Sequence, residues 1–310
     1  MLQQALRQVI LAAARNGRVR SVVAGAPLSR NVVRRFVPGE SVEEAVRATT
    51  GLLAGGRTVS LDHLGEDVLD AGQAEATVKA YTLLLQRLSE AGLTGGGRAE
   101  VSVKLTAVGQ AIDRAMALDH ARTVCEAAAA AGTTVTLDME DHTTTDSTLE
   151  ILRQLRADFP GTGAVLQAYL HRTEGDCRDL AFAGSRVRLC KGAYREPASV
   201  AYQARADVEA SYVRCLRVLM AGPGYPMVAT HDPALIAVTA DLARGRERGT
   251  YEYQLLYGIR PLEQERLTAL GETVRVYLPY GDQWYGYFMR RLAERPANVA
   301  FFLRSLATRS

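Results

Sequence analysis

The chain has 310 residues, of which 47% are hydrophobic and 23% are charged, a composition typical of a globular protein and unlike that of a disordered one. This length fits one large α/β domain or two ordinary ones. The formal net charge of +3 is too small and too dispersed to indicate a nucleic-acid partner, and no apolar stretch approaches the 18 residues that would indicate a bilayer-spanning helix.

Residues 1–57 are predicted to form an N-terminal helical arm. Residues 1–39 contain several arginines and no Asp or Glu, so the arm is basic. We interpret it as a helical arm and not as a mitochondrial presequence, because the basic pattern continues into the next helix without a break. That helix should begin at a capping box formed by Ser41 and Glu44 and end at Gly55-Gly56.

Residues 58–310 are predicted to form one catalytic domain. Short strand-like runs alternate here with apolar-periodic helical segments. The helical segments include 74–91, 112–131, 145–159, 200–220 and 233–248. The eight strand-like runs are TVSLDHLGE, EVSVKLT, VTLDMED, AVLQAYL, VRLCKG, PMVATHD, YEYQLLYG and VRVYLPYG. Eight such units favour a (β/α)8 barrel of the TIM type. A doubly wound sheet is the alternative, but no GxGxxG turn opens any helix.

The stretch 274–296 combines an apolar frame with several polar groups. It predicts the last strand, a turn at Pro279 and Gly281, and then a helix that begins near Asp282 and ends before Pro296. Arg290 and Arg291 lie on this helix beside an aromatic stripe. Adjacent arginines are often only a solvated helix face, but a planar guanidinium binds a carboxylate with two parallel hydrogen bonds, so the pair also suits a small anionic ligand.

Polar residues follow one strand after another at the predicted carboxyl ends. In a (β/α)8 barrel these ends meet at one face, where the active site lies. The residues that occupy them are Asp62, His63 and Glu66, then Lys104, then Asp138 to His142, then Gln167 and Tyr169, then Arg188, Lys191 and Tyr194, then Thr230, His231 and Asp232. We therefore expect a single polar site at this face.

Other chemistries compete for these residues. The run DMEDH offers carboxylates and imidazole, but its residues are adjacent and not spaced along one face, so we predict no metal site and expect an N-cap or supporting role for Asp141. Lys104 or Lys191 could form a Schiff base, as in an aldolase-like barrel. The four cysteines show no CxxC spacing, which favours reduced thiols in a cytosolic protein.

Several motifs, taken in order, resemble those of proline dehydrogenase, the flavin-dependent enzyme of proline catabolism. They are SVKLT, LDMED, VLQAYL, RLCKGAYREP, ATHD, YEYQLLYGI, RVYLPYG and YFMRRLAERPAN, and they extend over residues 35–298. The chain resembles the monofunctional bacterial form. The resemblance implies a distorted (β/α)8 barrel that holds FAD at its carboxyl face, with the helix after the last strand covering the active site.

The same resemblance implies roles for individual residues. Lys104, Arg290 and Arg291 would bind the carboxylate of L-proline, and Tyr194, Tyr277 and Tyr287 would form aromatic walls around its ring. Asp138 would orient Lys104, and Arg188 would reach the reactive nitrogen of the flavin; these two are the expected catalytic residues. The expected FAD contacts, besides Arg188, are Met139, Gln167, Lys191, Gly192, Ala193, Thr230 and His231.

The implied reaction is transfer of a hydride from C5 of proline to the flavin, which yields Δ1-pyrroline-5-carboxylate, the first step of proline degradation to glutamate. The family analogy makes a membrane quinone the electron acceptor. We expect a cytoplasmic enzyme whose basic N-terminal arm would favour peripheral association with anionic lipid at the inner face of the cell membrane.

Overall fold

Eight parallel strands form the centre of the molecule. The structure, a computed structural model, describes residues 33–294 and, within the last helix, the side chains up to Arg291. The strands are β1 (Thr58–His63), β2 (Ala99–Val103), β3 (Val135–Leu137), β4 (Ala164–Gln167), β5 (Arg186–Cys190), β6 (Tyr225–Ala229), β7 (Glu252–Leu256) and β8 (Val274–Tyr280). Their order in the sheet is β3-β2-β1-β8-β7-β6-β5-β4, and each pair of neighbours in the ladder is parallel.

The sheet closes between its two edge strands. Thr136 of β3 forms a parallel bridge with Gly163, just before β4, and Leu137 N donates to Gly163 O at 2.9 Å. A Cβ on Gly163 would lie 2.6 Å from Thr136 Oγ1, so glycine permits this close approach. The strand order, with this closure, confirms the predicted (β/α)8 barrel.

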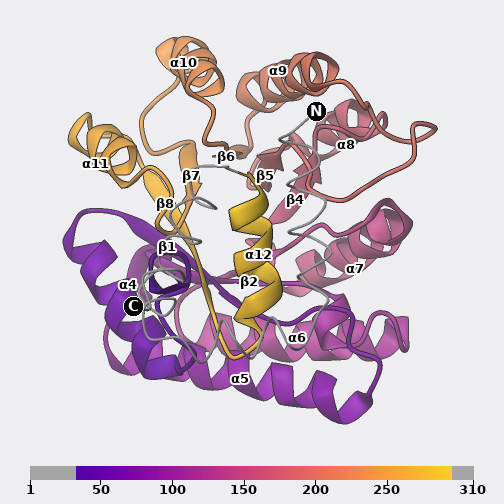
Figure 1. Cartoon of the computed structure of the whole chain (residues 1–310), viewed down its shortest axis with the longest axis vertical. Coiled ribbons are helices and arrows are strands. Elements are labelled where there is room, and N and C mark those ends of the chain that lie inside the picture. Colours follow the sequence, from indigo (N-terminus) through magenta and orange to yellow (C-terminus); the bar gives the residue numbers. More distant parts are fainter. Residues whose placement is uncertain (1–32, 295–310) are drawn as a thin grey trace, which may run out of the picture.

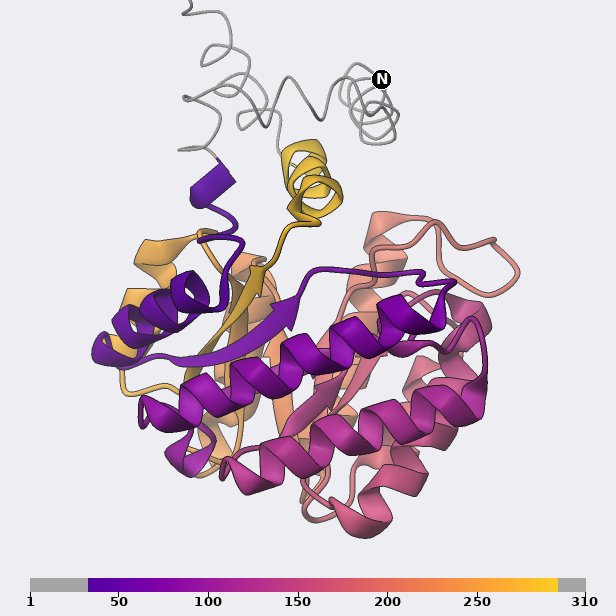
Figure 2. The same cartoon turned by 90° about the horizontal axis from the view of Figure 1, so that it is seen from below.

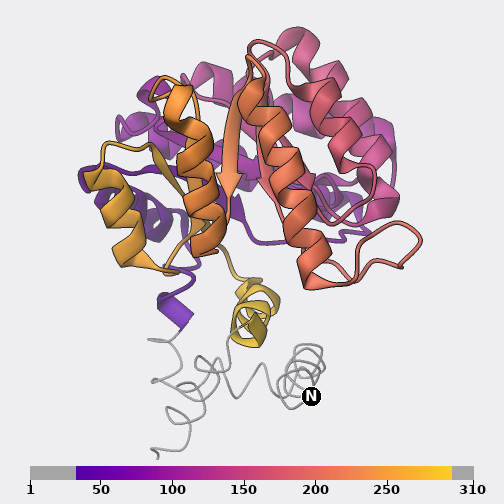
Figure 3. The ribbon, with the colours of Figure 1, turned by 90° about the horizontal axis from the view of Figure 1, so that it is seen from above.

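Helices surround the barrel in Figures 1 and 3. In the described part of the chain they are α4 (Val42–Ala54), α5 (Ala71–Glu90), α6 (Arg114–Ala130), α7 (Thr145–Asp158), α8 (Thr173–Leu180), α9 (Arg205–Ala221), α10 (Pro233–Leu242), α11 (Pro261–Ala269) and α12 (Trp284–Glu294). Short 3-10 turns occur at η1 (Gly95–Gly97), η2 (Thr106–Val108), η3 (His142–Thr144) and η4 (Ala243–Gly245). None of the helices described is both long and apolar enough to cross a membrane.

Several predicted boundaries are confirmed and others are wrong. The capping box of Ser41 and Glu44 opens α4, which ends at Gly55. The helix predicted from residue 200 begins instead at Arg205, because Ala201 forms an antiparallel bridge with Leu170. The strand predicted to reach residue 141 ends at Leu137, and the chain then turns into η3, whose N-cap is Asp141.

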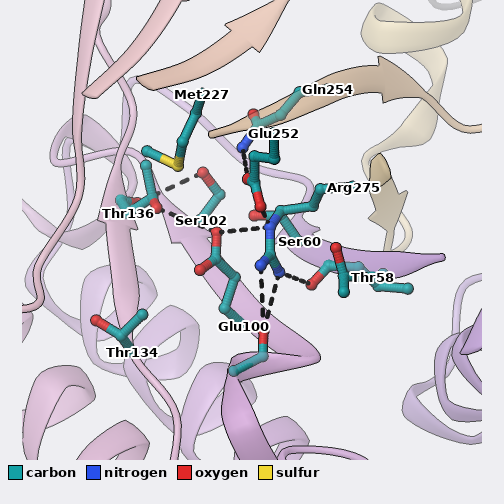
Figure 4. Close-up of polar contacts among 12 residues, drawn as sticks. Thr58, Ser60, Glu100, Ser102, Thr134, Thr136, Met227, Glu252, Gln254 and Arg275 are labelled. Atoms are coloured by element: carbon teal, nitrogen blue, oxygen red, sulfur yellow. Dashed lines mark hydrogen bonds and ion pairs between the residues drawn. The ribbon is translucent and has the colours of Figure 1, made fainter. Parts of the chain in front are cut away.

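The strands direct apolar side chains outward and polar ones inward. Val59, Leu61, Val276 and Leu278 are buried in the hydrophobic core that the barrel shares with its helices. The alternate positions carry polar side chains that contact one another across the barrel, and Figure 4 shows part of this network. Its charged members are Asp62, Glu100, Asp138 and Glu252, against Lys104, Arg186, Arg188 and Arg275. Four acids thus balance four bases inside the barrel.

The final helix α12 lies beyond the carboxyl ends of the strands, above the barrel mouth (Figure 2). The segment 33–40 packs against it: the Phe36 and Phe288 rings are 6.2 Å apart, and Trp284 Nε1 donates to Glu40 Oε1 at 2.7 Å. This confirms the predicted helix over the mouth. Of the predicted arm, residues 1–32 lie outside the described residues, and the domain boundary at residue 57 stays a prediction.

Candidate active site

Lys104 lies at the mouth of the barrel among carboxylates. Its Nζ is 2.7 Å from Asp62 Oδ2 and 3.8 Å from Asp138 Oδ2. Burial alone would lower the pKa of Lys104, but the charges of Asp62 and Asp138 outweigh it and raise that pKa. The ammonium group is therefore charged and held. A Schiff-base lysine requires the opposite, a lowered pKa, so Lys104 does not fit the aldolase-like alternative.

Asp138 is the centre of the hydrogen-bond network below Lys104. Its Oδ1 accepts from Arg188 Nη1 at 2.7 Å and from Ser102 Oγ at 2.8 Å, and its Oδ2 accepts from Tyr277 OH at 2.6 Å. The direct hydrogen bond of Lys104 is to Asp62, and Asp138 is a second carboxylate within ion-pair distance of its Nζ. That Asp138 orients Lys104 stays a prediction.

The Arg188 side chain is buried inside the barrel, with 4% of its surface exposed. Besides Asp138, its guanidinium contacts Ser102 Oγ at 2.9 Å, Ser60 Oγ at 3.2 Å and the amide oxygen of Gln254. The carbon Cζ also lies 5.2 Å from the centre of the Tyr277 ring. The four hydrogen-bond partners of Arg188 come from β1, β2, β7 and the end of β3. They fix the cation in position, so it can stabilise a nearby negative charge without reorganising.

Helix α12 brings Arg290 to the same mouth. Arg290 Nη1 donates to Glu66 Oε1 at 2.6 Å, which ties the helix to the loop after β1. Burial lowers the pKa of Arg290, but Glu66, Tyr194 and Asp62 together raise it. Because Asp62 is also the hydrogen-bond partner of Lys104, Arg290 on α12 is near enough to interact with the charges around Lys104. Arg291 lies over the ring of Tyr287, with 5.1 Å from Cζ to the ring centre. Tyr194 is exposed in the loop after β5.

The other expected contacts follow β3, β4 and β5. Met139 is buried directly after Asp138, and Gln167 Nε2 donates to the backbone oxygen of Glu140 at 2.7 Å. Lys191 Nζ lies 3.1 Å from Glu209 Oε1 and 2.9 Å from Asp232 Oδ2. Gly192 and Ala193 form the turn after Lys191.

Gly192 adopts a φ of +108°, and a Cβ there would lie 2.3 Å from the ring of Tyr169. Only glycine fits this close contact. The loop that contains Gly192 is anchored by Glu196, which accepts from His142 N at 2.9 Å and from Tyr169 OH at 3.2 Å. The turn after β5 is therefore held rigidly at the mouth.

Thr230 and His231 follow β6 at the same face. Thr230 Oγ1 accepts from Asp232 N at 3.1 Å, and His231 Nε2 accepts from Leu256 N at 2.9 Å. A ring nitrogen that accepts a backbone N–H carries no proton, so the proton of the neutral imidazole is on Nδ1. Arg260 Nη1 donates to His231 O at 2.7 Å and fixes the backbone of this turn.

The sequence prediction missed several members of the site. Ser60, Ser102 and Gln254 hold Arg188. Asp62 was expected at this face, but its hydrogen bond to Lys104 was not. A usable signal was present: polar residues recur two apart along single strands, as in Ser60/Asp62, Glu100/Ser102/Lys104, Arg186/Arg188 and Glu252/Gln254. Because side chains alternate between the two faces of a strand, such pairs indicate a polar barrel interior.

Glu140 is a buried carboxyl group at the edge of the site. Its Oε1 accepts from Thr106 N at 3.0 Å, and Thr106 Oγ1 donates to Oε2. Burial raises the pKa of Glu140 to about 7, although Thr106 and Lys104 oppose this. Among the residues with described placement, no three His, Cys, Asp or Glu side chains are grouped so that they could hold a metal ion.

Comparison with known proteins shows that this chain is similar to proline dehydrogenases. A family model described as proline dehydrogenase matches residues 45–304. Proline dehydrogenase from Deinococcus radiodurans is 40% identical over 313 residues, which cover 99% of each chain. Proline dehydrogenase 1 from Bacillus subtilis is 37% identical over 275 residues, covering 88% of this chain and 90% of the relative.

Solved structures show the same barrel. Proline utilization A from Bdellovibrio bacteriovorus, inactivated by N-propargylglycine, superposes with a TM-score of 0.80 at 24% identity, over 88% of this chain. The match spans 34% of that larger chain, so this chain corresponds to about a third of it. At this identity the likeness supports the fold alone.

Proposed function

Since the chain belongs to the proline dehydrogenase family, and is an oxidoreductase of proline catabolism, we propose that it oxidises L-proline to Δ1-pyrroline-5-carboxylate with FAD as its cofactor. The observation that carries the proposal is the convergence of Lys104, Asp138, Arg188 and Arg290 at one barrel mouth. Lys104 and Asp138 directly follow β2 and β3, Arg188 lies in β5 and Arg290 in α12, and the closed barrel brings them together.

The substrate would bind through its carboxylate. Lys104, Arg290 and Arg291 are the proposed ligands, and Tyr194 and Tyr287 the proposed walls around the ring. Lys104 is already held in its charged form by Asp62, and Arg290 is held by Glu66. Because the cations are positioned before substrate arrives, little side-chain entropy is lost when the carboxylate binds.

The residues present fit a flavin. The Arg188 guanidinium, fixed by its hydrogen bonds to Asp138, Ser102, Ser60 and Gln254, suits a ring that becomes more negative when it is reduced. When bound, the flavin would supply the acceptor for the hydride from C5 of proline. We propose that Arg188, as a catalytic residue, stabilises the negative charge that this transfer places on the ring, and that Asp138 holds the Arg188 guanidinium in place.

We propose that the remaining cofactor contacts come from four successive turns at the carboxyl face, those that follow β3, β4, β5 and β6. The residues are Met139, Gln167, Lys191, Gly192, Ala193, Thr230 and His231. Lys191 would exchange one of its carboxylate partners, Glu209 or Asp232, for a group of the cofactor. These turns are held by backbone hydrogen bonds and by side chains that donate to backbone oxygens, so the surface offered to the cofactor is fixed.

For the return of the flavin to its oxidised form, we propose a membrane quinone as electron acceptor and peripheral association with the inner face of the cell membrane. The support is the basic composition of residues 1–39 and the family analogy. Turnover with a short-chain quinone, compared with turnover with molecular oxygen, tests the acceptor. Co-sedimentation with vesicles rich in anionic lipid tests the membrane contact.

An anaerobic titration with L-proline tests the core of the proposal. The purified protein should be yellow, and proline should bleach its visible absorption in proportion to the amount added. A preparation that stays colourless after incubation with FAD would overturn the proposal. Borohydride should trap no substrate on Lys104 or Lys191; a trapped adduct would instead support the Schiff-base alternative.

A further inference from the structure

Each nitrogen of the Arg188 guanidinium has its own partner. Nη1 donates to Asp138 and Ser102, Nη2 donates to Ser60, and Nε donates to the amide oxygen of Gln254. Ser60, Ser102 and Asp138 come from the β1, β2 and β3 side of the barrel, whereas Gln254 comes from β7, on the other side of β8 in the sheet order. Gln254 is therefore the partner that holds the guanidinium from that side.

The amide of Gln254 can adopt only one orientation. Its Nε2 donates to Glu252 Oε1, and its Oε1 accepts from Arg188. Turning the amide over would place its N–H groups against the guanidinium and its oxygen against a carboxylate, two repulsive contacts. Both Gln254 and Glu252 are buried, at 4% and 0% exposure, so water cannot replace either bond.

Glu252 is itself held by side chains near the amino-terminal ends of the strands. Its Oε1 also accepts from Arg275 Nε at 2.8 Å, and its Oε2 accepts from Tyr225 OH at 3.2 Å. Arg275 lies 3.7 Å from Glu100, which pairs with Arg186 at 2.6 Å. We name Glu100, Arg186, Glu252 and Arg275 the basal ion cluster; the four lie near the amino-terminal ends of β2, β5, β7 and β8. Figure 4 shows three of them, Glu100, Glu252 and Arg275. Burial opposes ionisation of Glu100, yet the arginines lower its pKa to about 2, so the cluster is charged.

We propose that Gln254, oriented by the basal ion cluster through Glu252, is a positioning residue that fixes Arg188 for flavin reduction. The proposal rests on the proposed function, in which Arg188 faces the flavin. The physical reason is that a fixed cation stabilises developing charge without reorganisation, whereas a mobile one must be ordered during the reaction. A neutral amide provides this fixing bond without adding a charge beside the ring.

The charge balance explains why glutamine suits this position better than glutamate. The interior network has four acidic and four basic side chains. A carboxylate at position 254 would still accept from Arg188, but it would add one negative charge and face Glu252 across the bond that the amide now makes. It would therefore disfavour the reduced, more negative flavin.

Two substitutions separate positioning from simple packing. Gln254→Met removes both hydrogen bonds at similar volume, and Gln254→Glu keeps the acceptor for Arg188 but adds a charge. The control is Thr136→Val, which removes the hydroxyl that donates to Glu100 Oε1 at 3.2 Å and does not touch Arg188. For each FAD-loaded protein the flavin midpoint potential is measured by dye equilibration, together with kcat and KM for proline.

We expect Gln254→Met to lower kcat about tenfold while KM stays within about twofold, because the bond lost is one to a charged group and the substrate-binding cations are untouched. The midpoint potential should fall by about 30 mV, which is the tenfold change expressed for a two-electron couple. Gln254→Glu should lower the potential further, and Thr136→Val should leave it unchanged.

Unchanged potentials in both Gln254 variants, or an equal shift in Thr136→Val, would overturn the positioning role. If Gln254→Met does not fold, Gln254→Asn takes its place, because it is neutral and polar but one methylene too short to keep both hydrogen bonds; a purely structural role predicts the wild-type potential for it. A wild-type protein that binds no flavin overturns the proposed function and the positioning role together. If proline reduces the flavin of the wild-type protein but the Gln254 variants keep the wild-type midpoint potential, only the positioning role is overturned.

Discussion

Lys104 and Asp62 form a direct ion pair, 2.7 Å from Nζ to Oδ2, between two neighbouring strands at the mouth of the barrel. The Asp62 side chain is 2% exposed and that of Lys104 is 13% exposed, so the pair is shielded from water. Such a pair contributes little when it is intact, because its attraction offsets the loss of hydration. Removing one partner is costly, since the other charge stays buried.

We therefore expect Asp62→Asn to lower the free energy of unfolding by about 3 kcal/mol, somewhat less than for an isolated pair because Asp138 remains 3.8 Å from Lys104. Denaturant unfolding measures the change. The matched control is Asp158→Asn, which removes the partner of Arg122 at the surface, where water screens the charges. Equal losses in the two variants would contradict the importance of the Lys104 pair.

Glu66→Gln tests the tie between α12 and the loop after β1. About a third of each side chain of the Glu66–Arg290 pair is exposed, so solvent screens the charges and we expect little change in stability. The proposed role of Arg290 depends on its position, so KM for proline should rise severalfold while kcat changes little. Steady-state kinetics measure this. Glu90→Gln, which breaks the surface pairing with Arg87 at the end of α5, is the control; a similar rise in KM there would argue against the tie.

Trp284→Phe tests how the segment 33–40 holds α12. The substitution keeps an aromatic ring near Phe288 but removes the hydrogen bond to the Glu40 carboxylate. A hydrogen bond to a charged group contributes about 1.5–3 kcal/mol, so thermal unfolding should occur at a lower temperature and KM for proline should rise. Glu40→Gln keeps an acceptor for the indole and should show a smaller effect. Wild-type behaviour of Trp284→Phe would show that this bond does not hold α12, and equal losses in the two variants would show that the bond depends entirely on the charge of Glu40.

The fold and the outline of the site could be predicted because they depend on local patterns. Eight strand-like runs separated by helical segments indicate a barrel, and Lys104, Asp138 and Arg188 could be placed at its mouth because they end or nearly end such runs. The partner of Lys104 could not be chosen in this way. Asp62 and Asp138 both follow the rule, and only the stagger of the strands decides which carboxylate is nearer.

The partners of Arg188 could not be chosen from the sequence either, for a different reason. Ser60, Ser102 and Gln254 are ordinary residues in a sequence, and their role comes from meeting Arg188 inside the closed barrel. The helix start at Arg205 was missed because Ala201 pairs with Leu170, a contact between segments about thirty residues apart that periodicity cannot reveal.

Glu140→Gln should remove a pH dependence of stability. Burial raises the pKa of Glu140 in the folded protein to about 7, from the ordinary carboxyl value of 4.5. Between these pH values the folded state holds a proton that the unfolded state has lost, so the contribution of Glu140 to stability is greatest below pH 4.5 and is lost as pH rises towards 7. For one proton the slope is about 1.4 kcal/mol per pH unit.

The measurement is the difference in unfolding free energy between wild type and Glu140→Gln at pH 5.5 and at pH 8. Glutamine resembles the protonated carboxyl group and can still bond to Thr106. The stability advantage of the variant over wild type should be smaller at the lower pH and larger at the higher one. A difference between the two proteins that does not vary with pH would show that Glu140 is ionised throughout.

Gly192→Ala should weaken flavin binding more than it weakens the fold. Gly192 has a φ of +108°, and the added Cβ would meet the Tyr169 ring at 2.3 Å, so the turn after β5 or the ring must move. Gly184→Ala is a matched control because Gly184 also has a positive φ, of +83°, but nothing lies within 4 Å of its Cβ position. Both variants carry backbone strain, of about 1 kcal/mol, and only one carries the clash. Fluorescence titration with FAD should therefore show a raised Kd for Gly192→Ala and a wild-type Kd for Gly184→Ala; equal affinities in all three proteins would place the flavin away from this turn.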